Sequence, residues 1–303
     1  MSILNFGSLN IDYTYHVPRL VRPGETVAST CCELNCGGKG LNQSIALARS
    51  GAQVWHAGAV GADDGGLLLD ALKKAGVQTE LIRNLPSCNS GHAIIQVDEQ
   101  GENCILLYAG ANNAVTKEQA DDVLSRFSAG DLLVLQNEIS ELPYIMERAR
   151  DRGLRIALNP SPMDEVMQSL SPHSIDYLIL NEVEASSLCG NAGDPLEDLH
   201  TRFPAAKILL TLGSRGVRYW NGSRELRHAA YQVPIVDTTG AGDTFTGFFL
   251  GSLSQGLSEA SALERASKAA ALAISTLGAG ASIPTREAVE ASCLKLRTDD
   301  MQC

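Results

Sequence analysis

The sequence predicts an α/β protein in which a mostly parallel central sheet is covered by helices on both faces. The first observation is the order of the elements, because short apolar strands alternate with helical patterns along most of the 303 residues. The second is that glycines and polar side chains follow the strand ends, which form the ligand-binding edge of such a sheet. The third is a pair of hairpin-like segments, around residues 13–35 and 93–108, that need not belong to the main sheet.

Composition narrows the class of protein. A hydrophobic content of 44% in 303 residues provides apolar surface for one large α/β domain or two smaller ones. The net charge of -11, with no lysine- or arginine-rich run, argues against nucleic acid as the main partner and favours a small-molecule substrate. The N-terminus lacks a signal-like segment, and no apolar run approaches the ~18 residues of a membrane helix. We therefore expect a cytoplasmic protein that does not bind membranes.

The cysteines indicate neither a disulfide framework nor a zinc site. No Cys-x-x-Cys motif occurs, and the histidines form no His-Glu-x-x-His motif. We expect reduced thiols with structural roles at Cys31, Cys32, Cys36, Cys88, Cys104, Cys189, Cys293 and Cys303.

The first half of the chain is expected to begin with a buried strand at Ile3–Leu9, because this apolar run is closed by polar residues. Tyr13–Val17 and Thr26–Leu34 alternate loosely around a Pro-Gly turn, as expected for a flap. Apolar runs and helical periodicity predict the other elements: a helix from Leu41, a strand at Gln53–Gly61, a helix at Asp63–Ala75, a hairpin of His92–Val97 with Cys104–Tyr108, a helix at Thr116–Phe127 and a strand at Asp131–Leu135.

The second half repeats the strand-then-helix order. Strands are predicted at Arg155–Leu158, Ile175–Leu180 and Lys207–Leu212, followed by a hairpin of Val217–Trp220 with Leu226–Ala229 and a β-like run that ends at Val236. Helices are predicted at Ser140–Arg152, from Asn181, after Gly240, at Ser258–Thr276 and after Pro284.

The stretch Asp237-Thr-Thr-Gly-Ala-Gly-Asp-Thr-Phe-Thr-Gly-Phe-Phe249 combines a glycine turn with the start of an apolar helix. The amide groups of Gly240, Ala241 and Gly242 are expected to be free at the helix N-terminus, where they attract phosphate. Asp243 would repel an anion there unless it has another use, and general-base catalysis is one. The alternative is that Asp243 only complements the helix dipole.

A second glycine turn, Gly37-Gly-Lys-Gly40, also precedes a helical pattern. It is not a Walker A loop, because a glycine stands where that motif has its magnesium-binding hydroxyl. Lys39 and Asn42 are one turn apart and could donate hydrogen bonds to a ligand, unless Lys39 is a solvated lysine in a plain turn. Asn10 and Asp12 point to the same face of an extended chain, so they could hold two hydroxyl groups or form an Asx turn.

Polar residues also follow later strands. Glu138 stands at a strand's C-terminal end, where functional and structural roles are equally open. Asn181 and Glu184 share a helix face, but a helix cap with an acid in its first turn explains them equally well. Strand ends of a parallel sheet lie along one edge, so these side chains are expected to converge there. A sugar and a nucleoside triphosphate suit such a site, and phosphoryl transfer between them needs positioning and a base.

The two glycine turns resemble the signatures of a known family. Asp237-Thr-Thr-Gly-Ala-Gly-Asp-Thr-Phe245 resembles the C-terminal signature of the PfkB carbohydrate kinases, and Gly37-Gly-Lys-Gly-Leu-Asn-Gln43 resembles their N-terminal signature. Segments similar to the ribokinase branch of that family follow in order: Gly7-Ser-Leu-Asn-Ile-Asp12, Pro23-Gly-Glu-Thr26, Ala109-Gly-Ala-Asn112 and Thr211-Leu-Gly-Ser-Arg-Gly216. The resemblance implies one kinase domain over residues 1–303, with a ribokinase-like three-layer α/β/α sandwich and a small β lid from residues 13–35 and 93–108.

The resemblance also implies roles for particular residues. The implied sugar site is Asn10, Asp12, Gly38, Lys39, Asn42 and Glu138, with Asp243 as the base and Gly240, Ala241 and Gly242 as the anion hole. The implied site for the nucleotide and its magnesium is Asn181, Glu184, Thr211, Gly213, Ser214, Gly216 and Gly242, with Ser267 near the adenine. The implied potassium site is Asp237, Thr239, Ala273, Thr276, Gly278 and Ser282, several of them through backbone carbonyls. Ser267, where ribokinases tend to have Asn or His, and Asn137, a position that is usually apolar, depart from the pattern.

The expected activity is ATP-dependent phosphorylation of the primary 5-hydroxyl of D-ribose, with Mg²⁺ and K⁺ as cofactors. The alternatives are another kinase of the family that acts on deoxyribose, a nucleoside or another sugar, and a catalytically silent sugar- or nucleotide-binding protein. A nucleotide-linked dehydrogenase is excluded because no Gly-x-Gly-x-x-Gly follows the first strand. We expect a homodimer in which the lids of two subunits pack together, since an exposed sheet edge needs covering.

Overall fold

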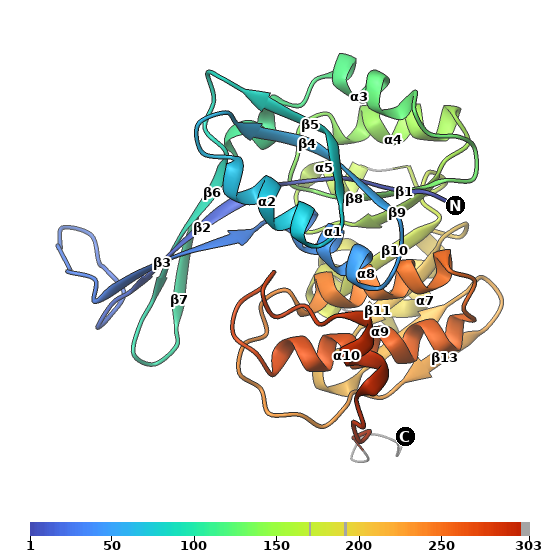
Figure 1. Ribbon diagram of the computed structural model, residues 1–303. Coiled ribbons are helices and arrows are strands. Elements are labelled where there is room, and N and C mark those ends of the chain that lie inside the picture. Colours follow the sequence, from blue (N-terminus) through green and yellow to red (C-terminus); the bar gives the residue numbers. More distant parts are fainter. Residues whose placement is uncertain (170, 191–192, 298–303) are drawn as a thin grey trace.

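The computed structural model describes residues 1–169, 171–190 and 193–297, and its main element is a nine-stranded sheet (Figure 1). From one edge to the other, its strands are β13 (Glu225–His228), β12 (Val217–Trp220), β11 (Lys207–Thr211), β10 (Tyr177–Asn181), β9 (Arg155–Asn159), β8 (Leu132–Gln136), β1 (Ile3–Phe6), β4 (Val54–Gly61) and β5 (Gln78–Leu85). All neighbours from β11 to β5 pair in parallel. The two antiparallel pairings of the sheet are those of β11 with β12 and of β12 with β13. The prediction of a mostly parallel sheet is confirmed.

Helices cover both faces of this sheet. Successive strand residues point to opposite sides, so strands that are apolar throughout present an apolar surface on each face. Ile3 belongs to one apolar cluster and Leu4 to the other. The first cluster is completed by α1 (Lys39–Arg49), α2 (Gly66–Lys74), α8 (Ala241–Ser254), α9 (Glu259–Ile274) and α10 (Arg286–Ala291). The second is completed by α3 (Lys117–Leu124), α4 (Leu142–Asp151), α5 (Glu165–Ser169), α6 (Glu182–Cys189) and α7 (Pro195–Arg202). The three-layer α/β/α sandwich is confirmed.

A separate four-stranded sheet extends away from the body and forms the lid (Figure 1). Its strands, in order, are β3 (Cys31–Gly37), β2 (Asn10–His16), β6 (Gly91–Val97) and β7 (Asn103–Tyr108). The two expected hairpins are present, and parallel pairing of β2 with β6 joins them into one sheet. Both hairpins reach a few residues further toward the body than the predicted ranges, so Asn10 lies within a lid strand.

Three predicted strand boundaries are wrong. The strand predicted at Thr26–Leu34 spans Cys31–Gly37, where it pairs with β2. The first strand ends at Phe6, not Leu9, because Gly7 and Ser8 turn the chain out of the main sheet before β2 begins. The β-like run that was expected to end at Val236 does not join the main sheet. Its one bridge pairs Tyr231 with Leu296, and Pro234 lacks the amide donor that a further ladder would need.

Several elements were absent from the sequence prediction. They are β5, α5, α7 and two short 3₁₀ turns, Gly110–Ala114 and Gly213–Arg215. The segment of β5 has no clean alternation, since its burial pattern mixes exposed and buried residues. Strand β5 covers the edge of the sheet beyond β4.

Helices α1 and α8 pack against each other with almost no separation. A Cβ on Gly247 would overlap Ala46 and the backbone of Leu47, and one on Gly251 would overlap the side chain of Ser50. The two helices therefore approach closely only because α8 has glycine at these two positions. This contact places the starts of α1 and α8, each preceded by a glycine turn, beside each other.

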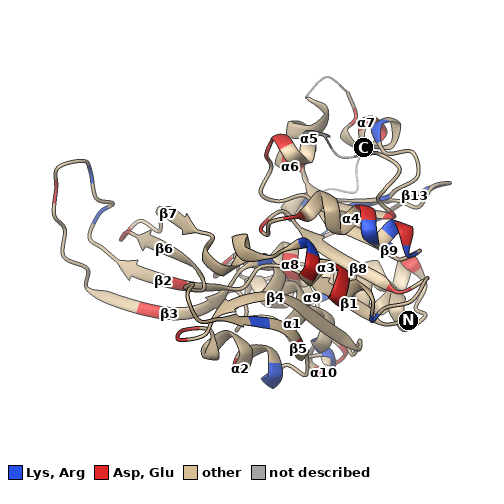
Figure 2. Cartoon of the chain, turned by 90° about the horizontal axis from the view of Figure 1, so that it is seen from above, with Lys and Arg blue, Asp and Glu red and all other residues tan. Residues whose placement is uncertain are grey.

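The described part of the chain has no helix with both the length and the apolar composition to cross a membrane. Lysines and arginines are interspersed with acidic residues along the chain (Figure 2). The seven cysteines within the described residues are all free, as expected, and Cys303 lies outside them.

Candidate active site

Asp243 lies in the first turn of α8, directly after the glycine turn. Gly240 precedes the helix with φ of 75°, a left-handed conformation that favours glycine. The first helical hydrogen bond is donated by Thr244 to Gly240, while Ala241 donates to Thr238 over 3.3 Å. The expectation of a free amide is therefore wrong for Ala241, because the turn before the helix places the Thr238 carbonyl beside it. The amide groups of Gly242 and Asp243 precede the first helical bond, so an anion can reach them at the helix N-terminus.

The Asp243 side chain is buried and held by two amides. Asn42 Nδ2 donates to Oδ2 over 3.1 Å, and Gln43 Nε2 donates to Oδ1 over 2.9 Å. Burial raises the pKa of Asp243, while the charge of Lys39 and the two amide hydrogen bonds oppose that rise. Only 8% of the residue is exposed, so these three groups are needed if the carboxylate is to be ionised.

Lys39 connects this carboxylate with two others. Burial would lower the pKa of Lys39, but the charges of Asp243, Glu138 and Glu184 together raise it above its ordinary value. The Lys39 amide donates to Glu138 Oε2 over 3.0 Å, and the Ser8 hydroxyl donates to the same oxygen. Burial raises the pKa of Glu138, and these two hydrogen bonds and the Lys39 charge counteract the effect. The positive charge of Lys39 therefore interacts with carboxylates from three separate segments of the chain.

Asp12 and Asn10 reach this cluster from lid strand β2. Burial and, secondarily, the charge of Glu138 raise the pKa of Asp12 to about 6. The neighbouring strand gives Asp12 its space, because a Cβ on Gly37 would overlap the carboxylate. Asn10 accepts a hydrogen bond of 2.7 Å from Asn112 Nδ2, which anchors this end of the lid to the loop after β7. Gly38 adopts a φ of 90° at the start of α1.

A cavity of about 220 Å³ joins the two glycine turns. It is lined by Lys39, Asn159, Ile179, Leu180, Asn181, Glu184, Thr211, Thr238, Gly240, Gly242, Asp243 and Thr246. A second cavity of about 330 Å³ adjoins the lid, and Asn10 and Glu138 from the expected sugar set line it together with Leu107, Asn137 and Pro162. Of the expected sugar residues, Asn10 and Glu138 line the larger cavity and Lys39 lines the smaller one, whereas Asp12, Gly38 and Asn42 line neither. Lys39 and Glu138 connect the linings, because the Lys39 amide donates to the Glu138 carboxylate.

The residues expected to bind the nucleotide are only partly brought together. Asn181 and Glu184 form a reciprocal capping box at the start of α6, the structural alternative that their spacing allowed. Both still line the smaller cavity with Thr211, and one oxygen of Glu184 is outside the capping bond. Gly213, Ser214, Gly216 and Ser267 are not among the residues that line this cavity.

The residues expected to hold potassium form a connected loop region. Asp237 accepts hydrogen bonds of 2.9 Å from the amides of Thr239 and Gly278, one on each carboxylate oxygen. Burial opposes ionisation of Asp237, but these hydrogen bonds keep its pKa below the ordinary value. Thr276 donates its amide to Ala273, and Ser282 donates its hydroxyl to Ala279. Asp237 therefore ties the loop before α8 to the loop after α9.

Some side chains at the site were missed by sequence reasoning. Asn159 and Thr246 line the smaller cavity, and Gln43 contacts Asp243 directly. Asn159 is the last residue of β9, so the rule that selected Glu138 could also have selected it. Gln43 follows Asn42 in the glycine-turn motif, but its partner Asp243 lies 200 residues further along the chain.

Comparison with known proteins identifies the family. The sequence model of the "pfkB family carbohydrate kinase" group matches residues 2–286. This chain belongs to the pfkB family of carbohydrate kinases. Like the other members, this pfkB kinase is an ATP-dependent enzyme that phosphorylates a carbohydrate. The fold and the two glycine turns agree with that membership.

Individual relatives extend over nearly the whole chain. Ribokinase from Bacillus subtilis is 36% identical over 292 residues, which covers 95% of this pfkB kinase and 98% of the relative. Deoxyribokinase from Salmonella typhi is 29% identical over 301 residues, with coverage of 95% and 97%. The structure of Arabidopsis thaliana ribokinase complexed with ribose and ATP superimposes with a TM-score of 0.85 at 29% identity, covering 95% of this chain and 97% of that one.

The expected role of Asp12 in sugar binding, together with its raised pKa, predicts a pH dependence of sugar affinity. Above about pH 6 the carboxylate is ionised and accepts hydrogen bonds from hydroxyl groups, and below that pH it becomes protonated. The affinity for D-ribose, measured by calorimetry from pH 5 to pH 8, should therefore fall by up to about tenfold per unit as the pH drops below 6. In Asp12→Asn the inflection near pH 6 should disappear. An identical inflection in both proteins would contradict the assignment to Asp12.

Proposed function

We propose that this pfkB kinase transfers the γ-phosphoryl group of ATP to the primary 5-hydroxyl of D-ribose. The observation that supports the proposal best is the position of Asp243, between the polar cluster around Lys39 and the glycine turn of α8. A buried carboxylate beside an anion-attracting helix end suits a reaction in which a hydroxyl loses its proton while a phosphoryl group arrives. The 36% identity to a ribokinase supports ribose as the sugar.

In the proposed mechanism, the sugar lies against Asp12, Asn42 and Glu138. The Oδ1 atom of Asn42 is buried without a hydrogen-bond partner, so a sugar hydroxyl can donate to it. Asp243 takes the proton of the primary hydroxyl as that oxygen bonds to the γ-phosphorus and the bond to ADP breaks. The free amides of the α8 turn and the charge of Lys39 stabilise the negative charge on the transferring group.

The nucleotide is proposed to enter the smaller cavity from the side of Asn181, Glu184 and Thr211. Magnesium bound with ATP would neutralise phosphate charge, and the oxygen of Glu184 that is outside the capping box suits its preference for oxygen ligands. From the resemblance we also propose that Gly213, Ser214 and Gly216 contact the nucleotide and that Ser267 lies near the adenine.

The general-base role predicts that Asp243→Asn keeps the fold and binds D-ribose but loses turnover. The loss should be at least about 10²-fold and up to about 10⁴-fold, because base catalysis and the ionic hydrogen bonds are removed together. A coupled ADP-release assay measures turnover, and calorimetry measures ribose binding. Asp131→Asn is a matched control, since Asp131 precedes β8 at the opposite edge of the sheet and binds the amides of Ser2 and Ser128. Near-normal turnover of Asp243→Asn would contradict the mechanism and favour a binding protein.

A second candidate substrate is a larger or modified pentose, such as deoxyribose or a nucleoside. The cavity of about 330 Å³ lined by Asn10 and Glu138 supports a nucleoside, because it offers space beside two of the expected sugar residues. The 29% identity to a deoxyribokinase supports deoxyribose. Turnover across pentoses, hexoses and nucleosides distinguishes the candidates, and D-ribose should have the highest kcat/KM. A nucleoside or deoxyribose with a higher value would replace ribose as the proposed substrate.

A potassium effect is proposed from the loop that Asp237 ties together. Its donors are oxygens of a carboxylate, hydroxyls and backbone carbonyls, which suits an alkali cation. The cation would act by fixing the turn at Gly240, without touching the substrate. In the described part of the chain, no group of three acidic, His or Cys residues offers a stronger metal site.

This arrangement predicts faster turnover in potassium than in sodium at fixed magnesium. Asp237→Asn should weaken the activation, because one of its two backbone hydrogen bonds would meet an amide group instead of a carboxylate oxygen. Asp131→Asn again serves as the control. Equal rates of the unmodified kinase in the two salts would rule out a functional potassium site.

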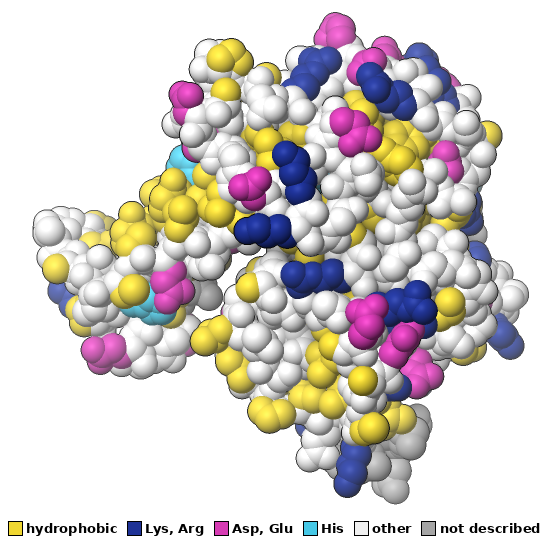
Figure 3. Space-filling view, viewed as in Figure 1, with side chains coloured by type: hydrophobic (Ala, Val, Ile, Leu, Met, Phe, Trp, Pro, Cys, Tyr) yellow, Lys and Arg dark blue, Asp and Glu magenta, His cyan; other side chains and the backbone are white. Residues whose placement is uncertain are grey.

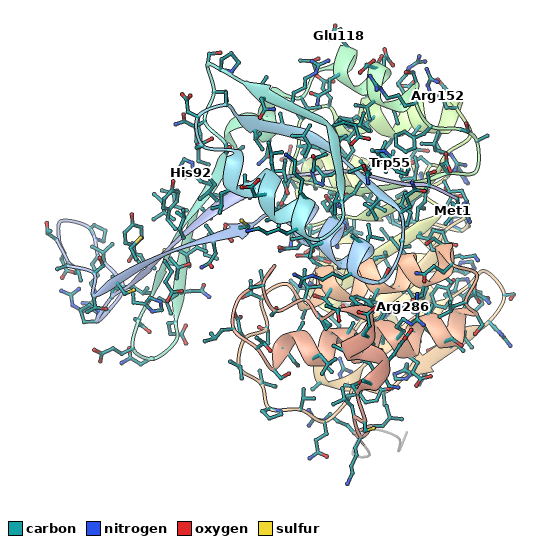
Figure 4. All side chains as sticks on the ribbon, in the orientation of Figure 1. Met1, Trp55, His92, Glu118, Arg152 and Arg286 are labelled. Atoms are coloured by element: carbon teal, nitrogen blue, oxygen red, sulfur yellow. The ribbon has the colours of Figure 1, made fainter. Side chains whose placement is uncertain are left out.

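The lid is proposed to pair with the lid of a second subunit. Its outer strand β7 is exposed along its whole length, and Leu106 is 67% exposed. Apolar side chains gather on the face of the lid that Figure 3 shows. His92 packs between Tyr13 and Tyr108 where the lid joins the body (Figure 4). These ring contacts hold strands β2, β6 and β7 together at that end of the lid. Sedimentation equilibrium should show a dimer that Leu106→Lys weakens, whereas Val183→Lys, at an exposed site on α6, should not.

A further inference from the structure

Five buried polar side chains form a continuous chain of hydrogen bonds behind Asp243. They are Gln43, Gln136, Asn5, Ser44 and His56, and each is 0% exposed. Gln136 Nε2 donates to Gln43 Oε1 over 2.7 Å and to Asn5 Oδ1 over 3.0 Å. Asn5 Nδ2 donates to Ser44 Oγ over 2.8 Å, and Ser44 Oγ lies 2.7 Å from His56 Nδ1. The chain links β1, α1, β8 and β4.

The hydrogen bonds of this chain can run in only one direction. The carbonyl oxygen of Gly7 can only accept a hydrogen bond, so the contact of 3.2 Å with His56 Nε2 places the ring proton on Nε2. In the neutral ring Nδ1 is then an acceptor, and the Ser44 hydroxyl donates to it. Burial lowers the pKa of His56 to about 4, so the ring is neutral at physiological pH. One end of the chain is therefore fixed in a single tautomer.

The opposite end is fixed by the same logic. The Gln136 amide group donates both of its hydrogen bonds, one to Asn5 and one to Gln43. The Gln43 side chain must therefore present its oxygen to Gln136. The Gln43 amide group then faces Asp243 Oδ1. If the Gln43 side chain were rotated by half a turn, its oxygen would oppose the carboxylate. The Gln136 oxygen packs directly against Gly7, where an added Cβ would overlap it.

We propose that Gln43 is a positioning residue for Asp243, and that the buried chain from His56 through Gln136 holds Gln43 in the only orientation that donates to the carboxylate. The proposal rests on the proposed function, in which Asp243 is the general base. Asn42 also donates to Asp243, but its other amide atom, Oδ1, has no partner, so Asn42 can turn toward a ligand. Gln43 cannot turn in this way, because its nitrogen is bound to Asp243 and its oxygen to Gln136.

Two consequences follow for Asp243. The Gln43 donor on Oδ1 holds the orientation of its carboxylate at the wall of the smaller cavity. The same donor favours the ionised form against the effect of burial, together with Lys39 and Asn42. Lys39 and Glu138 are the charged side chains that interact with Asp243, and neither belongs to the chain.

The test uses Gln43→Met and Gln136→Met, which keep side-chain length and remove the amide. In Gln43→Met we expect kcat with D-ribose to fall by about 10²-fold while KM changes little, since the misdirected group acts in the reaction and not in binding. The acid limb of the kcat–pH profile should move to higher pH, because the carboxylate has lost a donor. Gln136→Met, which removes a side chain outside both cavities, should give smaller changes in the same directions.

Gln119→Met is the matched control for loss of a buried glutamine amide. Gln119 is 1% exposed, and its amide donates to the carbonyl oxygen of Gly58 over 2.7 Å without joining the chain. It should lose a similar amount of thermal stability and keep the kcat and the acid limb of the unmodified kinase. Unchanged kcat and acid limb in Gln43→Met and Gln136→Met would overturn the proposal, as would equal losses in Gln119→Met.

A readout without turnover separates this proposal from the proposed function. In kinase labelled with ¹³C-carboxyl aspartate, the Asp243 resonance is identified by its absence in Asp243→Asn. Its NMR titration should move to higher pH in Gln43→Met and in Gln136→Met, but not in Gln119→Met. If no sugar is phosphorylated, the proposed function fails while this shift still supports the positioning chain. An unshifted titration of Asp243 would overturn the proposal of a positioning hydrogen-bond chain, even if ribose is the substrate.

Discussion

The close packing of α1 against α8 is the constraint on which the site depends. Gly247 and Gly251 leave no side chain between the two helices, so their backbones approach near Ala46 and Ser50. Both helices begin at glycine turns on the same edge of the sheet, and the contact brings Asn42 within hydrogen-bonding distance of Asp243 across 201 residues of sequence. A larger residue at Gly247 would separate the turn that holds Lys39 from the turn that attracts phosphate.

Charge balance is the second requirement. Asp12, Glu138 and Asp243 each have a pKa raised mainly by burial, and the positive charge of Lys39 interacts with Glu138, Glu184 and Asp243. Such an arrangement is costly without a ligand, because buried carboxylates lose hydration that one lysine only partly replaces. Neutral donors complete the balance: Ser8 for Glu138, and Asn42 and Gln43 for Asp243. Substrate hydroxyl groups can satisfy the oxygens that remain.

The sequence was most informative where function needs a local backbone shape. The turns before α1 and α8 were predicted correctly, because glycine followed by apolar residues at helical spacing indicates a helix N-terminus. Prediction was weaker where the outcome depends on distant partners. Asn10 lies in a lid strand because β6 pairs with β2, and Asn181 with Glu184 forms a capping box that its spacing allowed but could not require. Gln43 and Gln136 are ordinary polar residues until the fold brings them into contact.

The sequence by itself determined the α/β class, the two glycine turns and the identity of Asp243 as the candidate base, because each depends on short-range pattern and residue type. Only the tertiary structure decided which polar groups meet Asp243, which cavity each site residue lines, and where the two hairpins join to form the lid. The physical reason is that burial and hydrogen bonding depend on neighbours from other segments. The carboxylate of Asp243 accepts its side-chain hydrogen bonds from α1, which lies more than 190 residues earlier in the chain.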